Sequence, residues 1–553
     1  MNAKFLKRFL LLNWVLLASC SATTGTVSGV VYEKNGPVAG AIVRVQASPN
    51  FTTSDAKGAF TLTGLSSEKP VTLTVWASGY YITGGEKAYL PGENQAELEL
   101  IAHTGVDNPD YEWLSAFARE GDPSNCQNCH SQEGNPDSAL PFDEWRLDAH
   151  SSSAQNQRFV TMYTGSDLSG NQSPLTRTGY SRDYGSFPLA PDPSQPYYGP
   201  GYKLDFPETA GNCAACHAPA AAIDAAYGID PTTLTGVGAE GVGCDFCHKI
   251  WDVRLNDAGM PYPNMPGVLS YEFRRPAEGH QFFAGPLDDV APGEDTYSPL
   301  QKQSQYCAPC HFGVFWDTTI YNSFGEWLDS AYSDPISGQT CQDCHMPAGL
   351  TSHFARLEEG GLERDAETIF SHRMPGASDE ELMQNAVSVS VDARQENGEI
   401  VLEVGIVNDN TGHHIPTDSP LRQMILVVEV TNESGKQLAQ LSGPTIPDWG
   451  GIGEPSKGYY AGQPGTAYAK VLQELWTEIY PSGAYWNPTR ILSDNRIPAL
   501  GSDTTTYIFS AAESGEIRIS VRLFFRRAYI ELMDQKGWDV PDILMVHEEV
   551  ILG

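Results

Sequence analysis

Basic side chains are scarce in this chain of 553 residues, where 34 lysines and arginines stand against 69 acidic residues and leave a formal charge of −35. Such a charge repels nucleic acid and anionic lipid, so it excludes nucleic-acid binding and favours cationic partners. Long apolar runs are lacking too, because no stretch after the first 19 residues approaches the length of a membrane-spanning helix. The composition, 41% hydrophobic and 19% charged, is that of a globular chain.

The amino terminus has the pattern of an export signal. Lys4, Lys7 and Arg8 precede an apolar stretch over residues 9–17, as in a secretory signal peptide. Residues 17–20, Leu-Ala-Ser-Cys, resemble a bacterial lipobox, in which the cysteine is lipidated. We expect residues 1–19 to be a lipoprotein signal peptide and Cys20 to carry the membrane anchor. The alternative is an ordinary signal peptide cut nearby, which would leave Cys20 as a free thiol.

Export determines where we expect the protein to act. Anchored through Cys20, it would lie at the periplasmic or outer cell surface, or be extracellular.

The segment after the signal has the alternation of a β-domain. Short period-2 runs, such as 27–32 and 71–75, are separated by turn sequences at 34–37 and 55–58. The pattern predicts a small antiparallel β-sandwich over residues 20–103 that resembles the carboxypeptidase-regulatory-like modules. Because no catalytic constellation is visible there, a spacer or adhesive role is favoured.

The carboxyl-terminal segment returns to the same alternation. Runs at 387–391, 400–407, 424–430 and 517–523 predict a second β-sandwich over residues 386–553, with a loop-rich insertion from about 444 to 500.

Residues 104–385 lie between the two β-domains and contain long loops rich in Gly, Pro, Asp and Ser. Loops longer than about 12–15 residues are uncommon in compact domains, so something other than side-chain packing must supply the core. We expect a loop-rich, mainly α domain whose core is made of cofactors, and the whole chain to be multidomain.

Ten of the 11 cysteines fall into five Cys-x-x-Cys-His motifs. In such a motif the two thiols reach the vinyl groups of one haem, and the adjacent histidine points at the iron. The motifs therefore predict five covalently attached c-type haems. The attaching thiols are Cys126, Cys129, Cys213, Cys216, Cys244, Cys247, Cys307, Cys310, Cys341 and Cys344, and the proximal iron ligands are His130, His217, His248, His311 and His345.

Other uses of paired cysteines explain the pattern less well. Zinc ribbons need Cys pairs that meet in fours and have no use for a histidine after every pair. Thioredoxin-type pairs occur once, in a βαβ context. Structural disulfides would not place every pair beside a histidine.

Eight further histidines are available as second axial ligands. A lone histidine is more often a surface residue than a ligand, so each candidate depends on its setting. Five have a favourable setting: the end of an amphipathic pattern at 142–150, an apolar loop, two positions after the last motif, and a stiff turn at 410–417. These are His150, His280, His353, His372 and His413. His414 is the alternative to His413, Met346 and Met374 stay possible as ligands, and His103 and His547 lie in unremarkable contexts.

From about residue 110 to 553 the chain resembles the multihaem cytochromes c of the group that contains hydroxylamine oxidoreductase and pentahaem nitrite reductase. The resemblance rests on the five motifs and on residues 341–347, 371–376, 412–417, 494–498 and 523–527. It implies that the histidine of the Gly-His-x-x-Pro-Thr turn approaches a haem, which favours His413. The chain departs from these relatives because it has no Cys-x-x-Cys-Lys motif and has five haem motifs, where hydroxylamine oxidoreductases carry eight haems.

Irons that each hold two imidazoles have no open coordination site, so the first hypothesis is an electron carrier rather than an enzyme. It would pass electrons along five mostly bis-histidine haems in respiratory or extracellular electron transfer. Its partners would be other cytochromes or a membrane quinol-oxidising complex. Two alternatives stay open: an oxidoreductase that acts on a small nitrogen or sulfur oxyanion at one five-coordinate haem, and a subunit of a homopolymeric cytochrome filament.

Overall fold

The computed structural model describes residues 24–93, 95–121, 125–132, 139–511 and 515–553. The predicted signal peptide and Cys20 lie outside them. The chain divides into two compact units, Met1–His103 with Asp288–Gly293, and Thr104–Leu287 with Glu294–Gly553. In the described residues no helix has both the length and the apolar character to cross a membrane.

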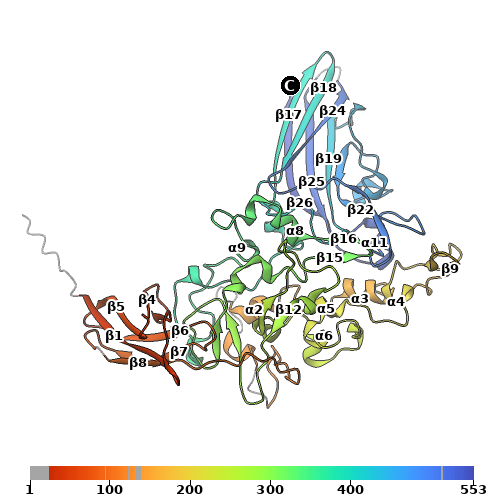
Figure 1. Cartoon of the computed structure of the whole chain (residues 1–553). Helices are drawn as coiled ribbons and strands as arrows, with labels where there is room; N and C mark the ends of the chain where they lie inside the picture. The colour runs from red at the N-terminus through yellow and green to blue at the C-terminus, as the bar shows by residue number, and fades with distance from the viewer. Residues whose placement is uncertain (1–23, 94, 122–124, 133–138, 512–514) are drawn as a thin grey trace, which may run out of the picture. The chain divides into compact units, whose positions relative to one another are not determined.

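The first unit is a two-sheet β-sandwich, drawn in red and orange in Figure 1. Its apolar side chains alternate with exposed ones, as in β5, and the inward set forms one core between the sheets. One sheet contains β1 (Thr24–Glu33), β2 (Gly36–Pro37), β5 (Ala59–Ser66) and β8 (Ala96–Glu99). The other contains β3 (Ile42–Val45), β4 (Phe51–Thr53), β6 (Val71–Trp76) and β7 (Thr83–Tyr89).

The expectation of a purely antiparallel sandwich is wrong at one strand pair. Strand β8 runs parallel to β1, with Gly29 opposite Ala96, because the chain crosses back from β7 in the other sheet before entering β8. A Cβ atom at Gly29 would lie 2.0 Å from the carbonyl oxygen of Ala96. The close backbone approach of this pair therefore requires glycine at position 29.

The first unit also includes the segment Asp288–Gly293, which lies far along the chain. The Arg44 guanidinium donates to both carboxylate oxygens of Asp288 at 2.6 and 2.9 Å, and the backbone N–H of Ala47 donates to Asp289 at 2.7 Å. A two-point guanidinium–carboxylate pair fixes direction as well as distance. The segment is thereby held in a defined place on this unit.

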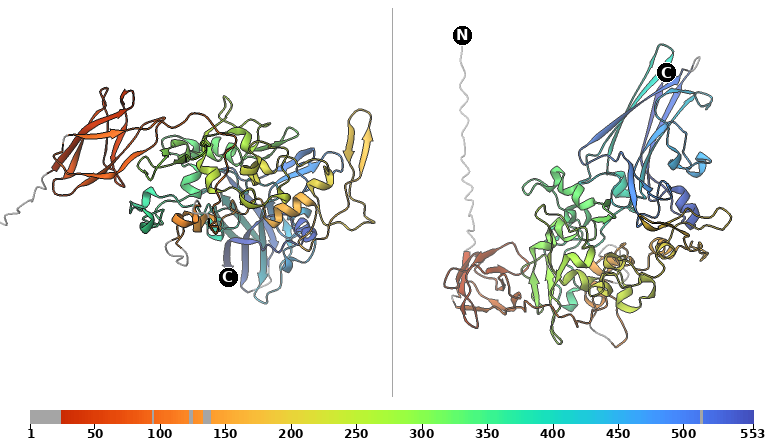
Figure 2. Two further views of the ribbon diagram at one scale, coloured as in Figure 1. Left: turned by 90° about the horizontal axis from the view of Figure 1, so that it is seen from below. Right: turned by 45° about the vertical axis from the view of Figure 1, so that its right-hand side comes forward.

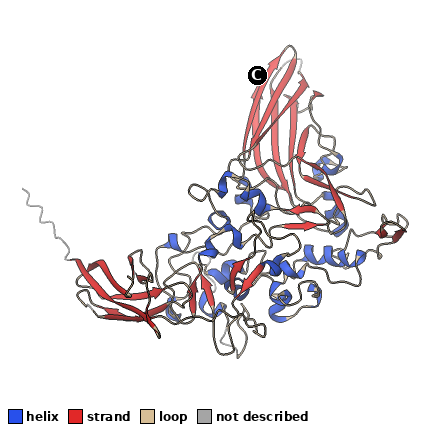
Figure 3. Ribbon diagram, viewed as in Figure 1, coloured by secondary structure: helices blue, strands red, loops and turns tan. Residues whose placement is uncertain are grey.

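The first half of the second unit is rich in loops, as expected, and its helices are one or two turns long (Figure 3). They are α1 (Gln127–His130), α2 (Pro141–Trp145), α3 (Gln157–Thr164), α4 (Tyr202–Asp205), α5 (Ala214–His217), α6 (Pro219–Ala222), α7 (Cys244–His248), α8 (Ser323–Leu328), α9 (Cys341–His345) and α10 (Glu380–Gln384).

Small two-stranded sheets, three antiparallel and one parallel, accompany these helices in the described residues, so the expected mainly α character holds only in part. The strand pairs are β9 (Thr178–Ser181) with β10 (Gly185–Pro188), β11 (Ile250–Val253) with β12 (Tyr271–Phe273), β13 (Phe283–Gly285) with β14 (Asp295–Tyr297), and β15 (Gly313–Phe315) with β16 (Thr318–Tyr321). The β9–β10 hairpin projects from the body of the second unit in both views of Figure 2. These strands have three or four residues, too few for a visible period-2 pattern.

The carboxyl-terminal half forms the expected second sandwich, whose long strands extend away from the short helices (Figure 1). One sheet has the order β17 (Ser388–Glu396), β18 (Glu399–Val407), β24 (Ser502–Ser510) and β20 (Gln440–Ser442). The other has the order β21 (Gly465–Tyr468), β19 (Gln423–Asn432), β25 (Ile517–Arg526) and β26 (Ile543–Leu552). Both sheets contribute side chains to a single core.

The insertion at about 444–500 is more ordered than its loop-rich sequence indicates. It contains β21 and the hairpin of β22 (Lys470–Glu474) with β23 (Thr489–Asp494). Its side chains Ile446, Tyr460 and Ala467 pack on Ile425 and Val427 of β19. The insertion thus covers the outer face of a strand whose side chains are buried on both sides.

Lys536 at the end of α11 (Ile530–Lys536) is fully buried against α3. Its ammonium group donates to the carbonyl oxygens of Thr161 at 3.0 Å, Ser166 at 3.1 Å and Pro200 at 2.6 Å. Burial lowers the pKa of Lys536 to about 7, with Asp167 acting weakly in the opposite direction. This lysine ties the carboxyl-terminal helix to the first half of the same unit.

The lowered pKa of Lys536 predicts a specific pH dependence of stability. The unfolded chain, with an ordinary lysine pKa near 10.4, binds more protons between about pH 7 and 10 than the folded chain, so this residue's contribution to stability rises with pH in that window. The difference in unfolding free energy between wild type and Lys536→Met should therefore rise with pH, by at most about 1.4 kcal/mol per pH unit. Urea unfolding of the full chain at several pH values measures it. Lys457→Met, at an exposed lysine, is the control, and parallel curves for wild type and Lys536→Met would contradict the prediction.

Candidate haem sites

The motif histidines are oriented alike by the local structure. In four of the five motifs the histidine is the last residue of a short helix, α1, α5, α7 or α9, while the motif at Cys307 follows the 3₁₀ turn Ser304–Tyr306. Four of the histidines place Nδ1 at hydrogen-bond distance from a backbone carbonyl. The pairs are His130 with Phe354 at 2.7 Å, His217 with Ser153 at 3.3 Å, His248 with Ala284 at 2.7 Å and His345 with Pro375 at 2.7 Å.

The fifth, His311, has its Nδ1 3.9 Å from a carboxylate oxygen of Asp418. Metal-binding histidines usually donate one ring N–H to a carbonyl or carboxylate, which leaves the lone pair of Nε2 for the metal. Four of the five motif histidines therefore have the arrangement that an iron ligand needs, while the His311 ring lies near a carboxylate without a hydrogen bond to it.

These histidines lie deep in the unit and yet border open space. Burial lowers the pKa values of His130, His248 and His311, and lowers that of His217 to about 4. The His311 side chain nevertheless keeps 41% of its surface exposed. An imidazole that is neutral at pH 7 is the form that binds a metal.

The ten motif cysteines are unbridged thiols, and thiols of different motifs contact each other. Proximity to a thiol of another motif raises the pKa of Cys244 next to Cys126, of Cys216 next to Cys310 and of Cys307 next to Cys341. Burial raises the pKa of Tyr306, and Cys247 and Cys310, from two of these motifs, both lie close enough to raise it further. The motifs therefore form one continuous cluster, in which the motif at Cys307 lies next to three others.

Two of the predicted second ligands face a motif histidine. The ring centroids of His150 and His311 are 6.3 Å apart, and so are those of His413 and His345. Two metal–imidazole bonds of about 2 Å each, with half a ring at either end, require a separation of about 6 Å. The two pairs have the spacing that a shared iron would impose, so the residues present fit the haem that the motifs predict.

His150 reaches its position from a turn rather than from a helix. The expected amphipathic helix over 142–150 ends at Trp145, and a side-chain oxygen of Asp148 then accepts from the backbone N–H of His150 at 2.8 Å and lies 2.6 Å from its Nδ1. Burial lowers the pKa of His150, but the hydrogen bond and charge of Asp148 outweigh burial and raise it. The carboxylate thus orients the ring toward His311.

His372 lies between two motifs. A side-chain oxygen of Glu144 accepts from its backbone N–H at 2.7 Å. Burial, together with repulsion from His248 and His130, lowers the pKa of His372 to about 4 against the opposing hydrogen bond to Phe370. His372 is therefore placed to serve one of these two motifs.

The positions of the other two predicted ligands, His280 and His353, give less support for a role as iron ligands. His280 is 62% exposed, with its Nδ1 2.7 Å from Glu294. His353 has its Nδ1 3.4 Å from the hydroxyl of Ser352 and precedes Phe354, which stacks on His130 at 6.2 Å. Both stay predictions.

The three histidines that are neither in a motif nor among the five predicted second ligands are His414, His547 and His103. His414 faces Glu326 at 3.7 Å, and His547 on β26 has its Nε2 3.0 Å from the hydroxyl of Ser520. His103 packs against Tyr81 in the first unit. In the described ranges no group of three or more His, Cys, Asp or Glu side chains converges as a bare metal ion would require.

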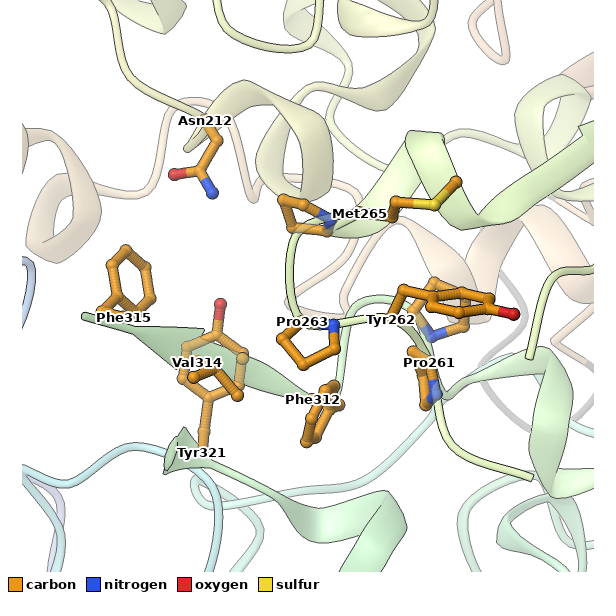
Figure 4. A pocket seen from close by; sticks show the side chains of 12 residues that line it. Asn212, Pro261, Tyr262, Pro263, Met265, Phe312, Val314, Phe315 and Tyr321 are labelled. Carbon is orange, nitrogen blue, oxygen red and sulfur yellow. The ribbon is translucent and has the colours of Figure 1, made fainter. Parts of the chain in front are cut away.

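A small open pocket lies between the motifs at Cys213 and Cys307 (Figure 4). Asn212, which precedes Cys213, and Phe312, which follows His311, line it together with Tyr321. Figure 4 shows the Tyr321 hydroxyl pointing toward the side of Asn212. The second and fourth motifs therefore border a common pocket.

Glu326 of α8 holds the turn that carries His413, and no sequence signal identified it. Its carboxylate accepts from the Thr417 hydroxyl at 2.5 Å, from the backbone N–H of His414 at 3.3 Å and from Arg496 at 2.7 Å. Arg496 also pairs with Asp494 at 2.8 Å. Asp418, whose carboxylate lies 3.9 Å from the His311 ring, was also not identified from the sequence, although it directly follows the turn at 410–417.

Comparisons with known proteins find similarities in both units of the chain. Residues 26–100 match the model of the carboxypeptidase regulatory-like domain, which confirms the expected resemblance there. A penta-heme cytochrome c552 from Thermochromatium tepidum is similar over 77% of this chain and 97% of its own, with a TM-score of 0.51 and 18% sequence identity. The Fcho1 Mu homology domain of Danio rerio, solved with a bound Eps15 peptide, aligns over 31% of this chain and 44% of its own at 9% identity and a TM-score of only 0.12. The search of curated proteins gives no match.

The greater part of the chain therefore has the fold of a penta-heme cytochrome. The amino-terminal sandwich is similar to the carboxypeptidase regulatory-like domains over residues 26–100. At this level of identity the likeness concerns fold alone.

The Glu326 contacts predict that the His413 turn depends on this carboxylate. Glu326→Gln leaves the buried Arg496 without one of its two carboxylates, so we expect the free energy of unfolding to fall by about 2 kcal/mol. Hydrogen exchange at the backbone N–H of His414 should become faster. Glu516→Gln is the control, because Glu516 pairs with an exposed arginine and such pairs contribute little. Equal stabilities of the two variants would show that Glu326 does not hold the turn.

Proposed function

We propose that this protein is a pentahaem c-type cytochrome that transfers electrons. The observation that carries the proposal is the facing of His150 with His311 and of His413 with His345 at 6.3 Å. When bound, a haem supplies an iron that exchanges one electron between its ferric and ferrous states. An iron held by two imidazoles has no open site for a substrate, which leaves electron transfer as its role.

The contacts between motifs support transfer through the whole cluster. Thiol contacts link the motif at Cys126 to that at Cys244, and the motif at Cys307 to those at Cys213 and Cys341. Cys247 and Cys310 connect these two groups around Tyr306. Cofactors attached at adjacent thiols would lie close enough for electrons to move between them, with the Cys307 motif as the branch point.

The cellular setting belongs to the same proposal. The signal pattern and Cys20 support a lipoprotein at an exported membrane surface, in respiratory or extracellular electron transfer. The formal charge of −35 supports docking to redox partners with basic surfaces, such as other cytochromes or a quinol-oxidising complex.

The haem count tests the proposal directly. The mass of the mature protein, produced in a host that matures c-type cytochromes, should equal the polypeptide plus five haems, one for each motif. A variant with both Cys341→Ala and Cys344→Ala should lose one haem. Cys20→Ala is the control: it should keep all five while losing the lipid. A protein of polypeptide mass alone would refute the proposal.

The two adjacent histidines of the turn offer a matched pair of variants. His413→Ala should convert about one iron in five to the high-spin ferric form, because the His345 iron loses its second imidazole. His414→Ala should leave the ferric spectrum unchanged, since His414 faces Glu326. Electron paramagnetic resonance of both holoproteins measures the high-spin fraction. A high-spin signal only in His414→Ala would reverse the assignment.

A second candidate function is supported by His217. The His217 ring stacks on Phe159. His150, whose charge adds to burial in lowering the pKa of His217, already faces His311. An iron with one imidazole at this motif would be open to a small nitrogen or sulfur oxyanion, as an oxidoreductase requires. A high-spin fraction of about one fifth in the wild-type ferric protein favours this candidate, and an all-low-spin spectrum favours transfer alone.

A further inference from the structure

Three arginines from distant parts of the second unit lie near one another. Arg422 directly precedes β19 and Arg527 directly follows β25, next to the register pair Gln423–Arg526 of these two strands. Arg158 is in α3, whose Met162 shares one apolar cluster with Leu421 and Ala528, the neighbours of Arg422 and Arg527. Burial lowers the pKa of Arg158, and repulsion from Arg422 lowers it further. Burial likewise lowers the pKa of Arg527, with repulsion from Arg158 and Arg422 adding to it. We call these three residues the arginine cluster.

The cluster has too little negative charge of its own. Asp418 approaches Arg422 at 3.6 Å but also faces His311 at 3.9 Å. Throughout the described residues, neither Arg158 nor Arg527 has a carboxylate within 4.0 Å, and the buried Nε of Arg527 has no hydrogen-bond partner. Three positive charges against one negative charge in a partly buried place are unfavourable unless an anion joins them.

The cluster lies beside the predicted haem motifs. Phe159, the neighbour of Arg158 in α3, stacks on the His217 ring at 4.0 Å with an interplanar angle of 7°. Burial raises the pKa of Tyr485, and the charges of Cys213 and Asp418 both raise it further. Burial also raises the pKa of Tyr321, and the charges of Cys216 and Asp418 both add to it. Arg158 and Asp418 thus bring the cluster next to the motif at Cys213 and the pocket of Figure 4.

We propose that Arg158, Arg422 and Arg527 form a binding site for a carboxylate or a small inorganic oxyanion beside the Cys213–His217 motif. Guanidinium groups bind such anions through paired N–H donors, and the bound charge would cancel their mutual repulsion. Two sources have this chemistry: a propionate of the haem at this motif, or a diffusible oxyanion such as sulfate or nitrite. The first source rests on the proposed function, and the second does not.

The test compares holoproteins carrying Arg158→Gln or Arg527→Gln with wild type and with Arg518→Gln, an exposed arginine. A diffusible anion predicts that millimolar sulfate or nitrite raises the thermal midpoint of wild type above that in chloride of equal ionic strength. Both cluster variants should bind the anion at least tenfold more weakly, and Arg518→Gln should bind it like wild type.

A propionate predicts a different result. Sulfate and nitrite should then have no effect beyond that of chloride, while either cluster variant should lower the midpoint potential of one haem, because the loss of a nearby positive charge favours the ferric state. The cluster variants should keep the wild-type haem count.

The proposal is overturned if neither the anion effect nor the potential shift is seen in correctly folded variants. Near-wild-type circular dichroism and haem content establish that folding. A wild-type protein without haem would refute the proposed function but leave the sulfate and nitrite measurement as a valid test of the cluster.

Discussion

The hydrogen bond between a motif histidine and a distant backbone carbonyl, formed at four of the five motifs, is the contact on which the second unit depends. His130 reaches Phe354, 224 residues away, and His217 reaches Ser153, 64 residues away. A short helix can present a histidine, but only a partner from another segment fixes its ring. These contacts join distant loops beside an apolar cluster that includes Phe246, Tyr271 and Phe273, so the motifs and a side-chain core together hold the segment.

The carboxyl-terminal sandwich contributes to the site as well as to stability. Its turn supplies His413 opposite His345, and Asp418 from the same turn faces His311. Glu326 of α8 holds that turn from the opposite side. A β-domain with its own core is a rigid support for such a turn, because a site is more exact on a stable element than on a free loop.

The sequence predicted the elements with a strong local pattern and missed those formed by long-range contacts. The strands at 400–407 and 424–430 are confirmed as β18 and β19 because period-2 alternation is a local property. The parallel β1–β8 pair and the two-stranded sheets were missed, since pairing direction is set by chain crossings and strands of three residues have no period. At the site, the spacing of the motif at Cys341 identified His345, whereas Glu326 and Asp418 carry no local signal.

Charge connects the site to the rest of the molecule. A chain with about twice as many acidic as basic residues has many carboxylates, yet among the described residues Asp418 is the one that pairs with the arginine cluster within 4.0 Å. Carboxylates placed elsewhere in this unit do pair with buried cations, as Asp542 does with Arg526 at 2.7 Å and Glu326 with Arg496. The fold therefore satisfies buried guanidinium groups where their role is structural. The unpaired positive charge at Arg158 and Arg527 is explained most simply by a negative charge that the polypeptide does not itself supply.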